Sequence, residues 1–147
     1  MAEPYCFETG GERYALDRRL IEGVIEPEEI VTLPLSPDVL LGVAYWRGAF
    51  LPAVRTPALL GLPDRGAPAV LLMLRHEGRG VALAADAVGG GGGPVEPPPG
   101  DGPGPARGPV KLGGADTEQV ATWLDARLLL DAAEQALAGK AGHPGQS

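Results

Sequence analysis

The sequence predicts a mostly β protein built from small barrels, with a few short helices and one helix near the C-terminus. Apolar segments of strand length recur along the 147 residues, and turn signals rich in Gly and Pro separate them. An Ala- and Leu-rich pattern with helical spacing begins only at Ala126. Strands and helices do not alternate regularly along the chain, which argues against a doubly wound α/β fold.

The first expected element is a β-hairpin. Tyr5–Thr9 and Glu12–Leu16 have strand-like composition and flank Gly10-Gly11, a dipeptide that accepts the positive φ angles of a tight turn. Cys6 alternates with aromatic neighbours in the first of these strands, a pattern typical of a small core residue.

A short helix and a third strand are expected next. Asp17 can cap a helix of one or two turns, which Gly23 would end. Val24-Ile25 then begins a strand that Pro27 stops. Residues 31–38 are expected to form an extended, turn-rich connection, because they contain two prolines.

The second expected hairpin carries an arginine at its bend. Leu41–Trp46 and Ala49–Val54 are apolar runs on either side of Arg47-Gly48. A lone buried guanidinium would be very costly, so the arginine must be solvated or paired. Arg47 is therefore either a member of an ordinary surface ion pair or a protein contact, since exposed Arg among aromatic residues is favoured at interfaces. Trp46 is either a core residue or part of the same contact.

The middle of the chain is expected to hold a short helix and two buried strands. Pro57 suits the start of a helix that ends at Gly61. Ala67–Arg75 contains a continuous apolar run, typical of a strand buried on both faces, and Val81–Val88 runs back beside it. Asp86 in this second strand is expected to point outward or to hydrogen-bond a backbone amide.

The segment Gly89–Pro109 differs from the rest of the chain. Glycine and proline occupy 16 of its 21 positions, so it has little apolar surface with which to offset its ordering entropy. We expect a mobile or irregular loop. Its run of glycines is not a phosphate-binding loop, because no Gly-Lys-Ser/Thr follows. Val110–Leu112 is expected to be a short strand.

The C-terminal part predicts one more element of ambiguous type and then a helix. Gln119–Leu124 fits either strand or helix by periodicity alone. The helix from Ala126 has a plausible stop at Gly139. We expect a single domain over residues 5–138 and a disordered tail over residues 139–147.

Composition and charge narrow the functional class. The formal net charge of −7 and the isoelectric point of about 4.7 argue against a nucleic-acid or anionic-membrane partner. The N-terminus lacks the pattern of a signal peptide, and the longest apolar stretch is too short to span a bilayer. We therefore expect a soluble cytoplasmic protein without direct membrane insertion.

The sequence contains no convincing catalytic or metal site. Cys6 and His76 are a conceivable nucleophile and base, but no orienting third residue or oxyanion element accompanies them. Glu26, Glu28 and Glu29 form a small acidic cluster without the spacing of a known metal motif. No cofactor is expected.

Several motifs, in this order, resemble the CheW family of bacterial chemotaxis coupling proteins. The most specific motif runs Gly42-Val43, Arg47-Gly48, Pro52. The other matching motifs are Tyr14-Ala15-Leu16 with Ile21, Val24 and Ile25, then Leu59-Leu60-Gly61, then Val81, Asp86 and Val88, and finally Trp123-Leu124-Asp125 with Leu129-Leu130. The resemblance extends from about Cys6 to Leu137, and its strength lies in the order and spacing of the motifs.

This resemblance implies a fold of two small, packed, five-stranded SH3-like β-barrels and no enzymatic activity. Members of the family act as adaptors between the cytoplasmic tips of chemoreceptors and the regulatory domain of the histidine kinase CheA. By position, Arg47 matches the arginine at the partner-facing part of the first barrel, and Ile21 and Val24 match positions of the binding surface. Tyr45, Trp46 and Phe50 flank this arginine and complete the predicted partner-binding residues.

The chain departs from the family pattern beside this surface. The family usually has Asn at Tyr45 and Asp-Leu at Arg55-Thr56, and it often has Glu at Gly23. In addition, glycines in Gly89–Pro109 replace a strand that the family pattern has after Val88. Gly23, Arg55 and this segment support an alternative from another class, a structural or self-assembling homo-oligomer of CheW type in a motility or developmental pathway other than chemotaxis. A small hydrolase or redox enzyme that uses Cys6 is the third hypothesis.

Overall fold

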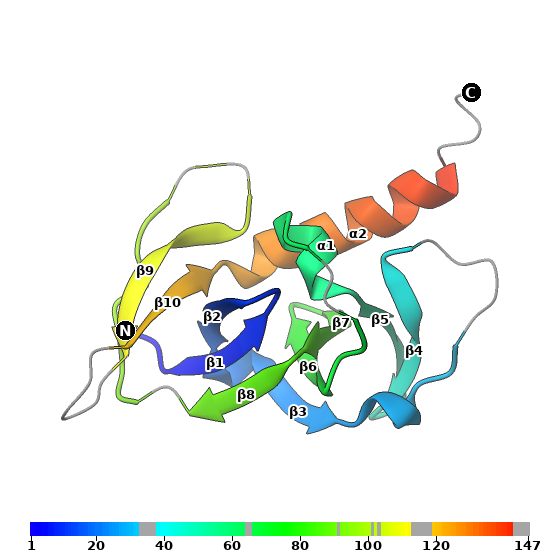
Figure 1. Cartoon of the computed structure of the whole chain (residues 1–147), viewed down its shortest axis with the longest axis horizontal. Coiled ribbons are helices and arrows are strands. Elements are labelled where there is room, and N and C mark those ends of the chain that lie inside the picture. The colour runs from blue at the N-terminus through cyan, green and yellow to red at the C-terminus, as the bar shows by residue number, and fades with distance from the viewer. Residues whose placement is uncertain are drawn as a thin grey trace.

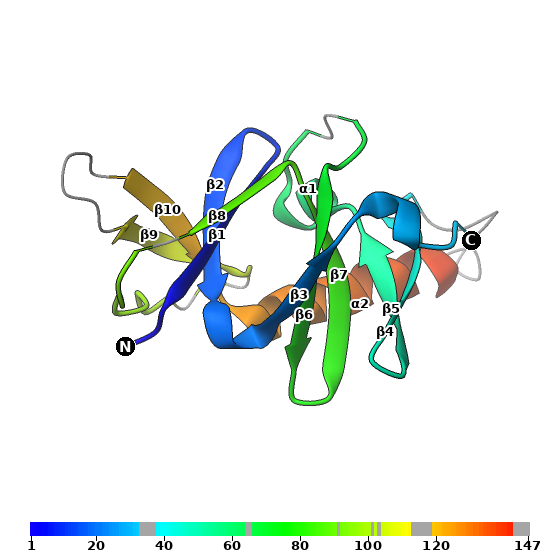
Figure 2. The same ribbon diagram turned by 90° about the horizontal axis from the view of Figure 1, so that it is seen from below.

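The computed structural model describes residues 1–32, 38–63, 66–90, 92–100, 102, 104–112 and 119–142. These residues form two five-stranded sheets accompanied by helices (Figures 1 and 2). The strands are β1 (Pro4–Thr9), β2 (Glu12–Asp17), β3 (Ile21–Ile25), β4 (Leu40–Trp46), β5 (Ala49–Val54), β6 (Val70–His76), β7 (Arg79–Ala85), β8 (Ala87–Gly90), β9 (Ala106–Leu112) and β10 (Gln119–Leu124). The helices are the 3-10 turns η1 (Arg18–Leu20) and η2 (Pro27–Glu29) and the α-helices α1 (Thr56–Leu60) and α2 (Ala126–Gly142).

The two sheets exchange segments of the chain. The first sheet has the order β8-β1-β2-β10-β9 and the second has the order β3-β6-β7-β5-β4. The chain passes from the first sheet to the second after β2 and returns after β7, so neither sheet is a continuous stretch of sequence. Figure 2 shows the two sheets side by side, with α2 beginning beside the first sheet and continuing along the second.

Three apolar clusters hold these layers together. One cluster is formed mainly by residues of the first sheet and contains Cys6 and Trp123. A second is formed mainly by residues of the second sheet and contains Leu71 and Met73. A central cluster lies between the sheets and includes Leu129 of α2. Because α2 contributes to this central cluster, it joins the two sheets into one packed body.

Strand β6 confirms the prediction of a strand buried on both faces. Leu71, Leu72, Met73 and Leu74 are all completely buried. Leu71 and Met73 face the cluster inside the second sheet, whereas Leu72 and Leu74 face the central cluster, as strand alternation requires. Each such leucine contributes about 1.5–3 kcal/mol of burial free energy.

The expected hairpins and the short helix are also present. The first hairpin turns at Gly10-Gly11, with φ angles of 61° and 85°. Helix α1 ends at Gly61, which has a left-handed φ of 71°. The ambiguous segment Gln119–Leu124 is a strand, and Asp125 caps α2 by accepting a hydrogen bond of 3.0 Å from the Leu128 amide.

The prediction of two five-stranded units is confirmed, but the sheets are not closed barrels. β8 and β9 are the edges of the first sheet, and β3 and β4 are the edges of the second. In the described part of the second sheet, an isolated bridge between Val31 and Val43 brings the chain after β3 beside β4. A side chain at Gly42 would overlap the carbonyl oxygen of Val31, so this glycine permits the approach.

Two predicted helix ends were wrong. Gly23 does not end a helix, because η1 is a single turn and Gly23 lies inside β3. Asp17 does cap this turn, and its side chain accepts from the Arg19 amide at 3.0 Å. Gly139 does not end α2, which extends to Gly142. A glycine inside a helix costs only about 1 kcal/mol, so the helix can continue through it. Of the predicted tail, residues 139–142 belong to α2, and residues 143–147 lie outside the described part.

The expected strand Val81–Val88 is two strands that belong to different sheets. β7 ends at Ala85 in the second sheet, and β8 begins at Ala87 in the first. Asp86 lies at the crossing point, where its amide donates to the carbonyl of Glu8 at 2.8 Å. Its side chain is exposed, as expected.

Among the described residues of the Gly- and Pro-rich segment, the irregular stretch is shorter than composition predicted, because both ends of the segment belong to strands. The segment's first residues complete β8, and its last residues begin β9 at Ala106. Between these strands, Val95 exchanges two backbone hydrogen bonds of 2.8 Å with Ala2 and packs against the cluster of the first sheet. Arg107 binds the carbonyl of Gly104 at 2.7 Å. Irregular backbone can thus be held by packing and hydrogen bonds that composition does not reveal.

Candidate protein-binding surface

The β4–β5 hairpin has the predicted arginine at its bend. Trp46 pairs with Ala49, so Arg47 and Gly48 form a two-residue connection. Their φ angles are 49° and 83°, both in the left-handed region that matches the twist of a two-residue hairpin. Left-handed backbone is uncommon for a residue with a side chain, so this geometry is specified by the hairpin as a whole. The Arg47 side chain is exposed.

An aromatic pair lies on the outward face of this hairpin. Tyr45 and Phe50 are cross-strand partners, and their ring centroids are 5.0 Å apart at 60°, an edge-to-face arrangement. Tyr45 is 64% exposed and Phe50 is 73% exposed, whereas Ala44 and Leu51 on the opposite face are buried. The fold therefore does not use these two rings as core.

Further apolar residues continue this face. Val43 pairs with Pro52 in the hairpin and with Val31 in the isolated bridge, and Val31 is 65% exposed. Residues that are directly paired in a sheet share one face. We call this face the hairpin surface, and it consists of Val31, Val43, Tyr45, Phe50 and Pro52, with Arg47 at its end.

Trp46 is mainly a core residue, and it lies on the opposite face of β4 from Tyr45. It packs, half-buried, against the apolar cluster inside the second sheet. Its indole N–H donates to the Glu22 carboxylate at 3.0 Å. The Arg47 guanidinium lies 5.2 Å from the centre of the indole, within the range of a cation–π contact.

Within the described part of the chain, Arg47 is not a member of an ordinary ion pair. Among the described residues, no carboxylate lies within ion-pair distance of its guanidinium. Its guanidinium is exposed and lies over the indole face of Trp46. The first of the two readings of Arg47 is therefore excluded within that part of the chain.

The structure separates the two predicted residues of β3. Val24 is 41% exposed, and the adjacent Gly23 lies against Trp46, so β3 and the hairpin meet at this point. Ile21 is half-buried and packs against the central cluster, opposite Leu74. Ile21 thus belongs to the packing between the sheets.

Two features of this surface could not be found by sequence reasoning. Val31 precedes a proline-containing connection and shows no strand pattern, so no feature of the sequence predicted its bridge to Val43. The Glu22–Trp46 hydrogen bond joins residues 24 positions apart, and only the fold brings them together.

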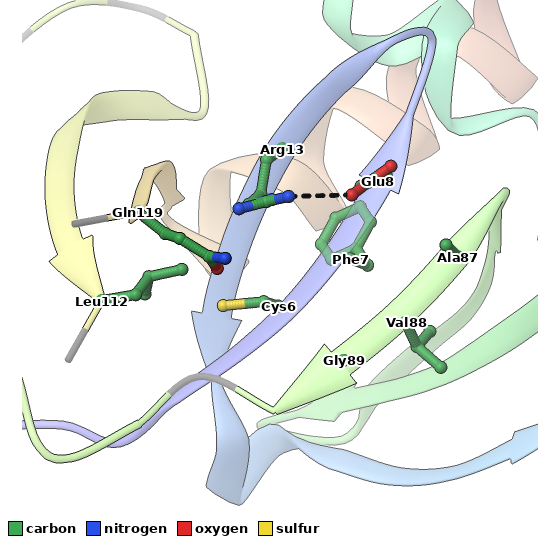
Figure 3. Close-up of a pocket in the computed structure, with 9 residues that line it drawn as sticks. All are labelled: Cys6, Phe7, Glu8, Arg13, Ala87, Val88, Gly89, Leu112 and Gln119. Carbon is green, nitrogen blue, oxygen red and sulfur yellow. Dashed lines mark hydrogen bonds and ion pairs between the residues drawn. The ribbon is translucent and has the colours of Figure 1, made fainter. Parts of the chain in front are cut away.

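A small pocket of about 120 Å³ surrounds Cys6 at the open side of the first sheet (Figure 3). Its walls come from β1, β2 and β8, with Leu112 and Gln119 on the other side. In the close-up, Arg13 and Glu8 form an ion pair of 3.1 Å at the rim.

The environment of Cys6 opposes its use as a nucleophile. Cys6 is only 4% exposed, and burial raises the pKa of its thiol, although the charges of Arg13 and Arg18 act in the opposite direction. A reactive cysteine needs a lowered pKa and an electropositive, accessible position. His76, its conceivable base, ends β6 in the second sheet and contacts Glu77 at 3.6 Å.

The acidic cluster has a structural role. The Glu29 carboxylate accepts a hydrogen bond of 3.1 Å from the Glu26 amide and so caps η2. Glu28 lies between them in the same turn. Within the described residues, no group of His, Cys, Asp and Glu side chains is arranged to hold a metal ion. Nor does any described helix have the length and apolar character needed to cross a membrane.

Comparisons with known proteins agree with this architecture. A family model described as a CheW-like domain matches residues 5–134. No curated protein matches the chain. A solved structure, the scaffolding protein TtCheW from Thermoanaerobacter tengcongensis, matches with a TM-score of 0.64 at 20% identity, over 84% of this chain and 89% of that one. At this identity the structural match shows the fold alone. Because the family model covers most of the chain, the protein belongs to the CheW-like domain family.

Proposed function

We propose that this protein is a non-enzymatic adaptor that couples chemoreceptors to a CheA-type histidine kinase in chemotaxis-like signalling. Its mechanism is assembly: it holds a receptor tip and the regulatory domain of the kinase together at the cytoplasmic face of the membrane. The observation that carries the proposal is the hairpin surface, where an exposed aromatic pair adjoins an arginine without a carboxylate partner among the described residues.

The composition of this surface suits protein binding. Aromatic residues and Arg dominate the binding energy of interfaces. Truncating one of the strongest contributors to Ala commonly costs more than about 2 kcal/mol of binding free energy. Tyr45 and Phe50 are available as such anchors because they contribute little to the core. Each partner in a standard-size interface buries about 800 Å². Neighbouring exposed residues such as Val24 would extend the hairpin surface toward that area.

Charge would set the orientation of the complex. The chain carries a net charge of −7, so an exposed cation at the end of the hairpin is a local exception to the overall potential. Charges at the rim of an interface steer the approach of partners and fix their register, and a charge-assisted contact also adds affinity. We therefore assign Arg47 an orienting role, beside the two aromatic anchors.

The first test is a pull-down with the cognate kinase regulatory domain and, separately, with the chemoreceptor tip. We expect Arg47→Ala to retain at least one partner about tenfold more weakly than wild type, because a charge-assisted contact is lost. Arg13→Ala is the matched control, since it removes one partly exposed cation, ion-paired to Glu8, from the first sheet, away from the hairpin. Equal retention of both partners by Arg47→Ala and wild type would remove Arg47 from the mechanism.

The same exposed aromatic pair could instead meet a second copy of the chain. Light scattering of the isolated protein separates this second function from the first. A discrete homo-oligomer that binds neither the kinase domain nor the receptor tip would favour a self-assembling structural protein. A monomer that binds the kinase would rule it out.

A further inference from the structure

Trp46 is fixed on two sides by residues of β3. Its indole N–H donates to Glu22 at 3.0 Å, and the other oxygen of this carboxylate lies 4.0 Å from Arg75 on β6. Its six-membered ring lies against the backbone of Gly23. The indole therefore has a defined orientation at the end of the second sheet, although it is only half-buried.

Gly23 is required by this orientation. A Cβ atom at position 23 would lie 2.6 Å from Cη2 and 2.7 Å from Cζ2 of Trp46. Any side chain at this position, including the glutamate that the family pattern often has, would displace the indole. The φ angle of Gly23 is not positive, so the need for glycine arises from the ring and not from the backbone.

The indole in turn is the one neighbour that holds the Arg47 head group among the described residues. The guanidinium lies 5.2 Å from its centre. No described carboxylate or carbonyl binds the guanidinium, and the backbone at Arg47 projects the side chain from the tip of the hairpin. Without the ring, this long side chain would sample many rotamers.

We infer that Trp46 is a positioning residue that holds the Arg47 guanidinium ready for a partner, and that Gly23 is the position that permits it. The partner part of this inference rests on the proposed adaptor function. The positioning itself is a property of the protein alone, and the two parts are tested by separate measurements.

The positioning is tested by NMR of the full chain without a partner. Protons of the Arg47 side chain should be shifted upfield by the ring current of the indole. Trp46→Leu should abolish this shift, whereas Trp46→Phe, which keeps an aromatic ring, should retain part of it. Gly23→Ala should reduce the shift by displacing the indole. Gly89→Ala is the matched control, because nothing lies within 4 Å of a Cβ built there.

The outcomes of this experiment decide the inference. An Arg47 shift that is unchanged by Trp46→Leu would overturn it, because the indole would then not hold the guanidinium. Should Trp46→Leu fail to fold, Gly23→Ala is compared with Gly89→Ala. An Arg47 shift that is the same in these two variants would overturn the inference.

The role in binding is tested by titrating the cognate kinase regulatory domain, or the receptor tip if only this partner is retained. We expect Trp46→Leu to weaken binding by about two- to fivefold, the range of an exposed cation–π contact. The double variant with Arg47→Ala should bind no more weakly than Arg47→Ala alone, because a positioning residue acts through its neighbour. Losses that multiply would show that the indole contacts the partner itself and would overturn the positioning role. If wild type binds neither probe, the adaptor function fails, and the NMR result still decides the positioning.

Discussion

At the scale of single residues, one contact explains a departure from the family pattern. Gly23 and Trp46 are far apart in sequence, and no pattern in the sequence relates them. In the structure, the indole occupies the space that a side chain at position 23 would need. The two positions are therefore linked by packing, which could be found only after the fold had placed β3 beside the hairpin.

Cys6 gives a prediction about reactivity. Because burial raises the pKa of its thiol, the thiolate is scarce at neutral pH. We expect a maleimide reagent at pH 7 to label Cys6 at least about a hundredfold more slowly in the folded protein than in urea, with mass spectrometry as the readout. Equally rapid labelling of both states would contradict the buried environment and revive the hypothesis of a cysteine enzyme.

The same shift fixes the sign of a pH effect. The thiol in the unfolded chain loses its proton near its ordinary pKa of 9.0, whereas the folded protein keeps it to a higher pH. The folded state then binds more protons, so the free energy of unfolding should fall as pH rises above about 9. Cys6→Ala should remove this part of the alkaline loss, as measured by urea unfolding at a series of pH values.

At the scale of elements, the sequence correctly predicted those turns, helix ends and strands that depend on residues close together in the chain. The Arg47-Gly48 and Gly10-Gly11 turns, the helix that ends at Gly61 and the buried run in β6 were all evident in the sequence. Each depends on residues within a few positions of one another.

Elements that depend on distant partners were not predictable in this way. The change of sheet at Asp86 is fixed by its hydrogen bond to Glu8, far away in sequence. Within the Gly- and Pro-rich segment, the position of Val95 depends on its two backbone hydrogen bonds to Ala2, which is far away in sequence. Composition correctly indicated irregular backbone there, but it could not show that β1 and its neighbours would hold that backbone.

Gly42 provides a test of how β4 is held at the edge of the second sheet. A Cβ atom at this position would overlap the carbonyl oxygen of Val31, a backbone atom that cannot rotate away. Gly42→Ala should therefore break the Val31–Val43 bridge and lower the free energy of unfolding by about 2 kcal/mol, as overpacking commonly does. Urea unfolding provides the measurement, and Gly89→Ala, with open space around its Cβ, is the control. Equal stability of both variants would contradict the close approach.

At the scale of the whole molecule, the two sheets are joined by the central cluster and by α2. Arg79 at the start of β7 strengthens this joint, because its guanidinium binds Asp131 at 2.7 Å and Glu134 at 3.2 Å on the helix. The arrangement leaves the outward face of the β4–β5 hairpin uncovered, while β6 and β7 are buried between the layers. An exposed aromatic hairpin on a packed body is compatible with the adaptor function proposed above.

The central claim is that this body joins two partners, and a three-component retention assay tests it most directly. The receptor tip is immobilised, and the kinase regulatory domain is added with or without the protein. We predict that the kinase domain is retained only when wild-type protein is present. With the variant Tyr45→Ser/Phe50→Ser, at least about tenfold less kinase domain should be retained than with wild type, because the variant lacks both aromatic anchors but keeps the core. Kinase retention that is the same with and without the wild-type protein would contradict the adaptor function.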